Sequence, residues 1–338
     1  MSRLATVAVM FALAVAGTAS ARPHAGPQFA AKEIATVVEA GLMGPSVASF
    51  RPQDPLTASE LATVVASLGG AIAVTDPDAE VSVRELHGHL VTLAGLRNEA
   101  RAIRLAATEA GLEPRPWLGT ETVARLLGLR VNHPRGQDEL ELQVTQAVTR
   151  SEAAYSIAVY LGLDPREVEA ARAAAATFAL PQLTEWQRVV LARAVRFVGA
   201  PYVWAGTSER PQQLFGKVLP GGFDCSGFVW RIYKARPFAG APRLSSALVG
   251  RTTHAMSAEV PRSARIGRGE LQPGDVVFFG ARGARSTPAE VGHMGIYVGS
   301  GWIVHSSRFG TTLTPMTGWY EQTFAWARSP LVEAGLEY

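Results

Sequence analysis

The chain has 338 residues, of which 47% are hydrophobic, and this is enough for two or three globular domains with apolar cores. Its formal net charge is only +3 and no basic run with interleaved aromatic residues occurs, so we predict no nucleic-acid partner. Because the chain has one cysteine, an intramolecular disulfide is excluded.

Residues 1–21 have the pattern of a secretory signal peptide. Arg3 precedes an apolar run from Leu4 to Gly17, and Ala19-Ser20-Ala21 supplies a small-x-small cleavage site. The apolar run is too short to span a membrane. We therefore expect an exported protein, extracellular or associated with the cell wall, with no integral membrane segment in the mature chain. A single thiol kept in an oxidising environment indicates that the thiol has a chemical use.

Residues 22–69 contain two predicted helices on either side of the turn-rich segment Phe50-Arg-Pro-Gln-Asp-Pro-Leu-Thr57. Residues 70–165 contain a more divergent copy, which ends in the sequence VTRSEAAYSIAVYLGL over 148–163. This order of helix, F-x-P loop and T-x-x-E helix resembles the S-layer homology repeat, a family that docks on wall polysaccharide. The resemblance implies an all-α N-terminal region with an anionic wall polysaccharide as partner. Alternatively, these are short helices that simply pack on one another.

Three histidines fall within the same region. His87 and His89 are two residues apart in a predicted helix, so they cannot share a helix face, and His133 precedes a proline in a loop. We predict surface or structural roles for all three, with no metal site and no cofactor. Residues 166–185 are predicted to be a helical linker, and residues 186–338 the C-terminal domain.

The only cysteine lies in the stretch Gly221-Gly-Phe-Asp-Cys-Ser-Gly-Phe-Val-Trp-Arg-Ile-Tyr233. Cys225 follows Asp224, a favourable helix N-cap, and apolar residues follow at helical spacing. A thiol in the first turn of a helix lies at the positive end of the helix dipole, which favours the nucleophilic thiolate. We therefore predict a reactive thiol at the start of a helix, not a cysteine buried for packing alone.

Two strands around His293 and His305 are predicted to form a hairpin through Gly299-Ser300-Gly301. If Val298 pairs with Trp302 across a three-residue loop, the two histidines become diagonal neighbours on one face of the hairpin. A two-residue loop would move His305 to the other face, because a slip of one residue inverts the sidedness of a strand.

A Cys-His-His arrangement follows from this register, in which Gly295 faces His305 and leaves room for the second imidazole. Cys225 would attack a carbonyl carbon, His293 would remove the thiol proton, and His305 would hold His293 in its productive tautomer. The Cys225 backbone N–H and the Tyr202 hydroxyl are candidate donors to the oxyanion. Zinc binding by the same three side chains is the main rival chemistry, although no fourth ligand is evident.

Five segments in order carry a family resemblance: PYVWAG (201–206), GGFDCSGFVWRIY (221–233), LQPGDVVFF (271–279), GHMGIYVG (292–299) and IVHSS (303–307). Together they resemble the NlpC-type cell-wall peptidases, a papain-like cysteine family, over about residues 186–328. The resemblance implies an α+β fold in which an antiparallel sheet packs on the cysteine helix. It also implies hydrolysis of a peptide bond in the peptidoglycan stem, typically between D-glutamate and a diamino acid.

The resemblance assigns roles to six residues: Cys225 as nucleophile, His293 as base, His305 as orienting group, Tyr202 as an active-site residue, and Asp224 and Ser226 as contacts to the free amino end of the substrate. Trp204 and Trp230 are predicted to be core residues. Two alternatives stay open: a wall-anchoring protein with an inactive peptidase fold, and a related thiol amidase or acyltransferase.

Overall fold

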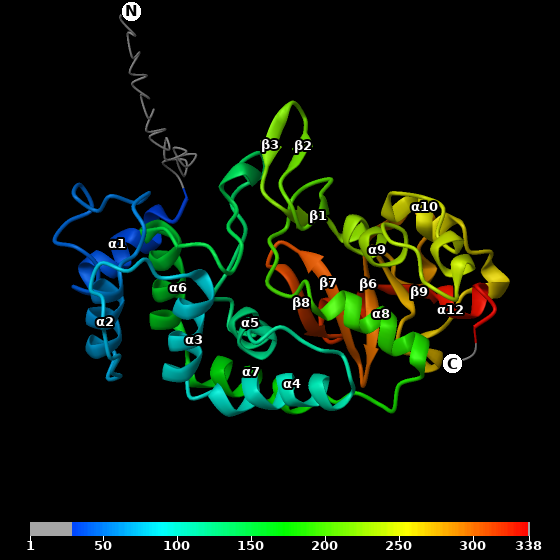
Figure 1. Ribbon diagram of the computed structural model, residues 1–338, viewed down its shortest axis with the longest axis horizontal. Coiled ribbons are helices and arrows are strands. Elements are labelled where there is room, and N and C mark those ends of the chain that lie inside the picture. The colour runs from blue at the N-terminus through cyan, green and yellow to red at the C-terminus, as the bar shows by residue number, and fades with distance from the viewer. Residues whose placement is uncertain (1–28, 337–338) are drawn as a thin grey trace, which may run out of the picture.

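The computed structural model describes residues 29–336, so the predicted signal segment lies outside the described residues. Figure 1 shows a helical N-terminal part beside a C-terminal part built of helices and a central sheet. No helix within 29–336 is both long and apolar enough to cross a membrane. The helices before the sheet are α1 (Ala31–Glu39), α2 (Ala58–Ser67), α3 (Val83–Leu93), α4 (Arg97–Glu109), α5 (Leu118–Leu126), α6 (Arg150–Gly162), α7 (Pro165–Ala176) and α8 (Glu185–Val195).

Three of these helices, α2, α3 and α6, begin with the same capping box, in which the backbone N–H of a Thr or Ser bonds to the Glu carboxylate three residues later. The pairs are Thr57 with Glu60, Ser82 with Glu85, and Thr149 with Glu152. The segments that lead into the helices form a closed ring of backbone hydrogen bonds, from Leu56 to Val148, from Val148 to Val81 and from Val81 to Leu56. The sequence predicts only two such copies, which end in the helices capped by Thr57 and Thr149, whereas the third capping box begins with Ser82 in place of threonine.

The main sheet has five antiparallel strands in the order β8-β7-β6-β5-β9. The strands are β5 (Val276–Gly280), β6 (Val291–Gly299), β7 (Trp302–Ser307), β8 (Gly310–Pro315) and β9 (Phe324–Arg328), and two short pairs join β1 (Thr207–Ser208) to β4 (Gly222–Phe223) and β2 (Gln212–Leu214) to β3 (Lys217–Leu219). The remaining helices are α9 (Cys225–Tyr233), α10 (Thr253–Ala258), α11 (Trp319–Thr323) and α12 (Pro330–Glu333). This confirms the predicted α+β class.

The cysteine helix α9 packs on one face of the sheet, against β6 and β7. Phe228, Val229 and Ile232 of the helix are buried in the same core as Met294 and Ile296 of β6. A second, smaller apolar cluster lies among alternate residues of the strands, including Val277, Phe279 and Ile303. Because side chains alternate between the faces of a strand, the sheet buries apolar residues on both sides.

The hairpin of β6 and β7 keeps the predicted sidedness but closes differently. Ile296 pairs with Val304 and Tyr297 with Ile303, as expected, whereas the closing pair is Gly299 with Trp302, with a register shift between Tyr297 and Gly299. The loop is therefore two residues long, and the expectation that such a loop would invert His305 is wrong. The register shift between Tyr297 and Gly299 is a bulge that adds one residue to β6. This extra residue compensates for the shorter loop, so His305 stays on the same face as His293.

The N-terminal helices contact the C-terminal part through side chains that bond to backbone carbonyls. Arg125 of α5 donates to the carbonyls of Phe309, at 2.6 Å, and Gly199, at 3.4 Å. Trp117 donates to the carbonyl of Val198 at 3.1 Å, and the backbone N–H of Asn132 donates to the carbonyl of Arg308 at 2.8 Å. These contacts fix the helical part on the loops that precede β1 and follow β7.

Arg125 belongs to a buried ionic cluster with Glu121 and His87. The Arg125–Glu121 distance is 2.5 Å and the Glu121–His87 distance 2.9 Å, and the Glu121 and Arg125 side chains are almost fully buried. Burial alone would raise the pKa of Glu121, but its interactions with the neighbouring His87 and Arg125 side chains outweigh burial and hold that pKa below its ordinary value. His87 therefore has a structural role: its imidazole bonds to the buried Glu121 carboxylate. This contact explains why a histidine lies on the buried face of α3.

Replacing Arg125 is expected to destabilise the protein strongly. In Arg125→Met, Glu121 keeps a buried charge with only His87 beside it, and breaking such a pair costs about 3–5 kcal/mol. Urea unfolding measures the loss. The double variant Glu121→Gln/Arg125→Met should be more stable than the single variant, because no charge is left unpaired. As a control, Arg172→Met, which breaks a partly exposed pair with Glu99, should cost about 1 kcal/mol or less. Equal losses in Arg125→Met and Arg172→Met would contradict the argument.

Candidate functional site

Cys225 is the first residue of α9, as predicted, and Asp224 is the N-cap. The Asp224 carboxylate accepts a hydrogen bond from the backbone N–H of Gly227 at 2.5 Å, which satisfies one of the unpaired donors at the helix start. The thiol is half-buried and hydrogen-bonded to the Thr253 hydroxyl of α10 at 3.4 Å. The backbone N–H of Met294, the residue after His293, is close enough to the sulfur to lower the pKa of the thiol slightly. The thiol therefore lies beside the part of β6 that carries His293.

The resting thiol is protonated. Burial raises the pKa of Cys225, and the nearby Asp224 charge adds to the effect, whereas the Thr253 hydroxyl and the backbone N–H groups of Ser226 and Met294 oppose it. The expectation from the helix dipole was the thiolate, and here burial outweighs the donors around the sulfur. Proton removal by a neighbouring base is therefore needed for nucleophilic attack.

His293 and His305 lie together on one face of the hairpin, as predicted. Nε2 of His293 is 2.8 Å from Nδ1 of His305, and the ring planes are nearly perpendicular. A side chain at Gly295 would come within 2.9 Å of the His305 Cβ, so glycine is needed for this close approach. Within the described residues no hydrogen bond joins the Cys225 thiol to His293, whose Nδ1 has no partner there.

Both imidazoles are neutral at pH 7. Burial lowers the pKa of His293 to about 4. Burial, together with the neighbouring His293, lowers the pKa of His305 well below its ordinary value. His305 is fully buried, and its Nε2 lies 3.1 Å from the Thr314 hydroxyl and 3.4 Å from the Tyr320 hydroxyl. A second histidine takes the place that a buried anion would occupy in other triads.

Aromatic rings of α11 and β5 surround the histidine pair on the side away from α9. Tyr320 lies edge-on to His305 at 5.1 Å between ring centroids, and Phe279 is 5.8 Å from His293. Trp319, half exposed, is 6.1 Å from His293. Burial raises the pKa of Tyr320 to about 12, so its hydroxyl stays a neutral hydrogen-bonding group. These rings account for the low polarity around the imidazoles.

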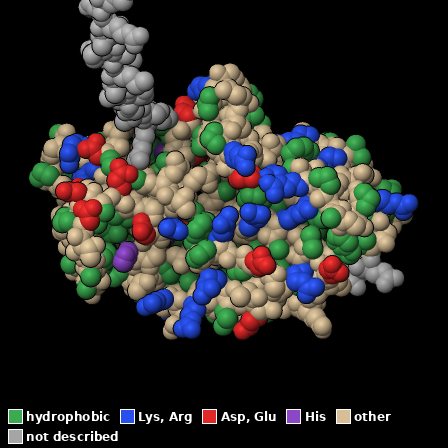
Figure 2. Space-filling model, viewed as in Figure 1, with side chains coloured by type: hydrophobic (Ala, Val, Ile, Leu, Met, Phe, Trp, Pro, Cys, Tyr) green, Lys and Arg blue, Asp and Glu red, His purple; other side chains and the backbone are tan. Residues whose placement is uncertain are grey.

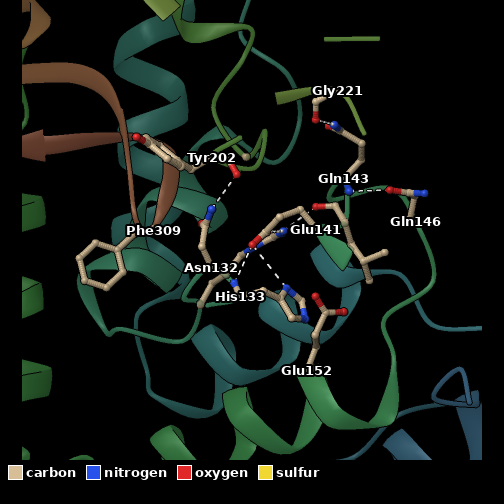
Figure 3. A network of polar contacts seen from close by, with 12 residues as sticks. Asn132, His133, Glu141, Gln143, Gln146, Glu152, Tyr202, Gly221 and Phe309 are labelled. Atoms are coloured by element: carbon tan, nitrogen blue, oxygen red, sulfur yellow. Dashed lines mark hydrogen bonds and ion pairs between the residues drawn. The ribbon is translucent and has the colours of Figure 1, made fainter. Parts of the chain in front are cut away.

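Tyr202 is held by the segment between α5 and α6. Asn132 donates a side-chain hydrogen bond to the Tyr202 carbonyl at 2.7 Å, as Figure 3 shows. Burial raises the pKa of Tyr202, and the neighbouring Cys225 and Asp224 side chains raise it further, so its hydroxyl is a neutral donor close to the thiol. Trp204 is half exposed and lies under the Arg135 guanidinium, so the prediction that it is a core residue is wrong.

A network of polar contacts lies next to Asn132 and is centred on Glu141 (Figure 3). The Glu141 carboxylate accepts from the backbone N–H of His133 at 2.7 Å and lies 3.6 Å from Arg130. Gln143 donates to the carbonyl of Gly221, close to the entry of α9. His133 is thus a structural histidine that pairs with Glu141. The segment between α5 and α6 thus holds two loops in place. Through Asn132 it holds the loop that carries Tyr202, and through Gln143 it holds the loop that leads into α9.

Asp224 and Ser226 form a buried polar cluster with Arg251. The Ser226 hydroxyl donates to Asp224 at 2.9 Å and accepts from Arg251 at 2.9 Å, and Arg251 is 3.3 Å from the second Asp224 oxygen. The helix cap and Arg251 therefore already contact the Asp224 carboxylate. A role of Asp224 and Ser226 in substrate binding stays a prediction. Sequence reasoning gave no role to Arg251, which is distant in sequence and lies in no recognisable motif.

Sequence reasoning also missed Thr253, Thr314 and Asn132, since each reaches the site only through the tertiary fold. His254, the residue after Thr253, is exposed, and its Nδ1 lies 3.1 Å from the Pro288 carbonyl. Within 29–336 no group of three or more His, Cys, Asp or Glu side chains is arranged to hold a metal ion.

The lowered histidine pKa values predict a loss of stability in acid. In the unfolded chain each histidine titrates near 6.5, whereas in the folded protein His293 titrates at about 4 and His305 well below 6.5. Between these values the unfolded state binds more protons, so the free energy of unfolding falls as the pH drops from about 6.5 to about 4 and is level above 6.5. Urea unfolding across this range measures the slope. The variant His293→Gln/His305→Gln should show a shallower fall, and equal slopes would contradict the assignment.

Comparison with known proteins places the site in a matched region. Residues 199–328 match the NlpC/P60 family. The murein DD-endopeptidase MepH of Escherichia coli (strain K12) is 34% identical over 123 residues, which is 36% of this chain and 37% of that protein. A gamma-D-glutamyl-L-lysine dipeptidyl-peptidase of Bacillus subtilis (strain 168) is 29% identical over 125 residues, which is 36% of this chain and 32% of that protein. The chain thus spans about a third of the length of these curated relatives.

Two solved structures are similar to part of this chain. An NlpC/P60 family protein from Bacillus cereus ATCC 10987 is 26% identical, with 46% of this chain and 43% of that one covered and a TM-score of 0.33. The peptidoglycan hydrolase RipB from Mycobacterium tuberculosis is 23% identical, with 45% of this chain and 65% of that one covered and a TM-score of 0.32.

Proposed function

Residues 199–328 form an NlpC/P60 domain, and from this premise we propose that the protein is a cysteine endopeptidase that hydrolyses peptide bonds in peptidoglycan stems. The observation that carries the proposal is the placement of the thiol at the start of α9, beside the strand that carries the first of two hydrogen-bonded imidazoles. The relatives named as a murein DD-endopeptidase and a gamma-D-glutamyl-L-lysine dipeptidyl-peptidase support the substrate class. Cys225, His293, His305 and Tyr202 are the proposed catalytic residues.

The histidine pair defines the proton path. Because Nε2 of His293 is engaged with His305, only Nδ1 is left to accept the thiol proton. Nδ1 must then be unprotonated in the resting enzyme, so Nε2–H donates to Nδ1 of His305. His305 in turn carries its proton on Nε2 and donates to the Thr314 hydroxyl. This chain of donors holds His293 in the tautomer that a general base needs.

Catalysis then proceeds by acyl transfer. His293 takes the thiol proton as the sulfur attacks the scissile carbonyl carbon, and the C–S bond forms as the carbonyl oxygen becomes an oxyanion. The Cys225 backbone N–H and the Tyr202 hydroxyl are the proposed donors to that oxyanion. The intermediate collapses with loss of the amine, which receives its proton from His293. Water, activated by the same imidazole, releases the acid and restores the thiol.

Export and wall attachment belong to the same proposal. The signal-like segment at residues 1–21 supports secretion to the cell wall or beyond, where the substrate occurs. The resemblance of residues 22–165 to S-layer homology repeats supports binding of a wall polysaccharide. Pull-down of the secreted protein by purified cell walls, with and without enzymatic removal of the polysaccharide, tests this part.

The bond that is cut is proposed to be the one between D-glutamate and the diamino acid. The relative named as a gamma-D-glutamyl-L-lysine dipeptidyl-peptidase favours this bond, whereas the relative named as a DD-endopeptidase favours a bond between two D-centres. Mass analysis of a digest of defined muropeptides separates them, since the first cut shortens a single stem and the second opens a cross-link. Release of intact stems from the sugar would identify an amidase, and intact substrate after prolonged incubation would favour the binding-only alternative.

Replacing Tyr202 with Phe is expected to lower kcat by roughly 10²–10³-fold with a smaller change in KM, because one oxyanion donor is lost in the transition state. Steady-state kinetics on a soluble stem peptide measures the effect. The control is Tyr160→Phe on α6, remote in sequence and outside the site, which should leave kcat unchanged. An unaltered kcat in Tyr202→Phe would remove Tyr202 from the mechanism.

A further inference from the structure

An open groove lies where the helical part meets the C-terminal part, apart from the catalytic residues. It has a volume of about 630 Å³ and is formed by the 111–116 loop after α4 on one side and by α8 on the other. Trp117, just beyond the loop, bonds to the carbonyl of Val198 and holds the loop against the end of α8. Gly111 lies directly on the stem of Arg188, because a side chain at Gly111 would come within 2.9 Å of it. The groove is therefore a fixed concavity with walls from both parts of the chain.

Four arginines line this groove, Arg115, Arg188, Arg193 and Arg196, with Glu113 as the only acidic residue among its lining residues. The local excess of positive charge is as large as the net charge of the whole chain, +3. Figure 2 shows Lys and Arg side chains spread over the face on which α4 and α8 lie in Figure 1, with Asp and Glu side chains among them. A concave site lined by one sign of charge attracts ligands of the opposite sign.

The structural role of these arginines is not the same for all four. Arg193 is committed to the fold, since it donates to the carbonyls of Ile232, Arg236 and Pro237 and stacks on Phe238. Arg115, Arg188 and Arg196 are exposed, and no ion pair joins them to an acidic side chain within the described residues. Three guanidinium groups are therefore available to a ligand. Guanidinium groups bind phosphate and carboxylate oxygens in a bidentate fashion.

We propose that Arg115, Arg188 and Arg196 form a docking groove for a linear anionic polymer of the cell wall, through phosphate or carboxylate oxygens spaced along the polymer. One wall of the groove, the 111–116 loop, lies within residues 22–165 but outside the capped helices α2, α3 and α6, and the groove crosses the junction of the two parts. It goes beyond the proposed hydrolysis by giving the enzyme a second contact with the wall. Such a contact would hold the catalytic part close to polymeric substrate.

A nucleic acid fits the groove less well. Binding of single strands relies on aromatic rings on which bases stack. The aromatic residue beside the groove is Trp117, and two guanidinium groups already cover it, from Arg84 at 5.3 Å and Arg115 at 5.9 Å. A flexible polymer with charged groups but no bases needs only the arginines.

Binding of three probes to the full-length protein tests the proposal: inorganic polyphosphate, poly-L-glutamate and single-stranded DNA, each at several salt concentrations. The groove variant is Arg115→Gln/Arg188→Gln/Arg196→Gln. Its matched control is Arg166→Gln/Arg243→Gln/Arg262→Gln, which removes three exposed arginines from other elements. We expect the groove variant to bind polyphosphate or polyglutamate about tenfold or more weakly than wild type. The slope of log Kd against log salt should fall by about 2 to 3, and the control should match wild type. Preference for polyphosphate or polyglutamate identifies phosphate or carboxylate as the natural group.

Three outcomes would overturn the proposal: no salt-dependent binding by wild type, equal losses in the groove and control variants, or tighter groove-dependent binding of DNA than of either other probe. Hydrolysis of a soluble stem peptide and the urea midpoint should be the same in wild type and both triple variants, which shows that the groove variant is folded. Polymer binding should also persist in Cys225→Ala. Failure of the groove and failure of the proposed hydrolysis are therefore distinguishable.

Discussion

Cys225→Ala is expected to abolish turnover of stem peptides, with a fall in kcat of roughly 10⁴–10⁶-fold, while the protein stays folded. The reason is that Cys225 supplies the only thiol in the chain, and no other side chain takes its place at the start of α9 beside the strand that carries His293. Cys225→Ser should be nearly as inactive. A hydroxyl is harder to deprotonate than a thiol, and His293, with a pKa of about 4, is a weak base.

Alkylation gives an independent test on the unaltered protein. Since the chain has one cysteine, iodoacetamide should add one label per chain, and activity should fall in proportion to labelling. Because burial raises the pKa of the thiol, labelling should be slow at neutral pH and accelerate in alkali. A fully labelled protein that still turns over substrate would refute the nucleophile assignment, as would Cys225→Ala with the wild-type rate.

His305→Ala is expected to lower kcat by roughly 10³–10⁴-fold, because the His293 ring loses the partner that fixes its tautomer. His305→Asn should retain more activity than His305→Ala, since its amide oxygen can still accept a hydrogen bond from Nε2 of His293. The pH dependence of kcat/KM distinguishes a loss of the His305 contact from a general disruption of the structure. In wild type the acid limb of kcat/KM should lie at about pH 4, the pKa of His293, and in His305→Ala it should move upward as water enters the space.

The control for this prediction is His89→Gln, in the helical part and remote from the site, which should leave both kcat and the pH profile unchanged. If His305→Ala kept the wild-type kcat, His305 would be a packing residue of the sheet, and the enzyme would operate with His293 alone. If kcat fell but the acid limb did not move, the effect would be structural.

The parts of the site that could be predicted from sequence are those set by local patterns. Asp224 before Cys225, followed by apolar residues at helical spacing, is enough to place the thiol at a helix start. Strand alternation is enough to place His293 and His305 on one face. The bulge near Val298 was not predictable, because it depends on how β6 fits both its neighbours and not on the turn residues alone.

Two features of the site could not be predicted from the sequence: how deeply its side chains are buried, and which residues distant in sequence bond to them. The helix dipole favours a thiolate, but the protonation state of Cys225 depends on burial beneath β6 and α10, which no local pattern reveals. Nothing in the sequence around Thr253 or Thr314 marks either residue as part of the site. Only the tertiary fold places the Thr253 hydroxyl beside the sulfur and the Thr314 hydroxyl beside His305. In the helical part, the helix at Val83–Leu93 was predicted, but its place as a third capped helix beside α2 and α6 was not, because only its Ser82–Glu85 box, and no longer motif, marks it.

The hydrogen bonds from Arg125 to the carbonyls of Phe309 and Gly199 affect how the C-terminal part can be prepared on its own. A recombinant fragment that begins near residue 199 would lack this guanidinium, and the turn after β7 would lose the anchor that sets the end of the strand carrying His305. Such a fragment should show faster amide exchange at the turn than the intact protein. A chimaera that joins residues 199–328 to another protein should therefore also include α5, which carries Arg125.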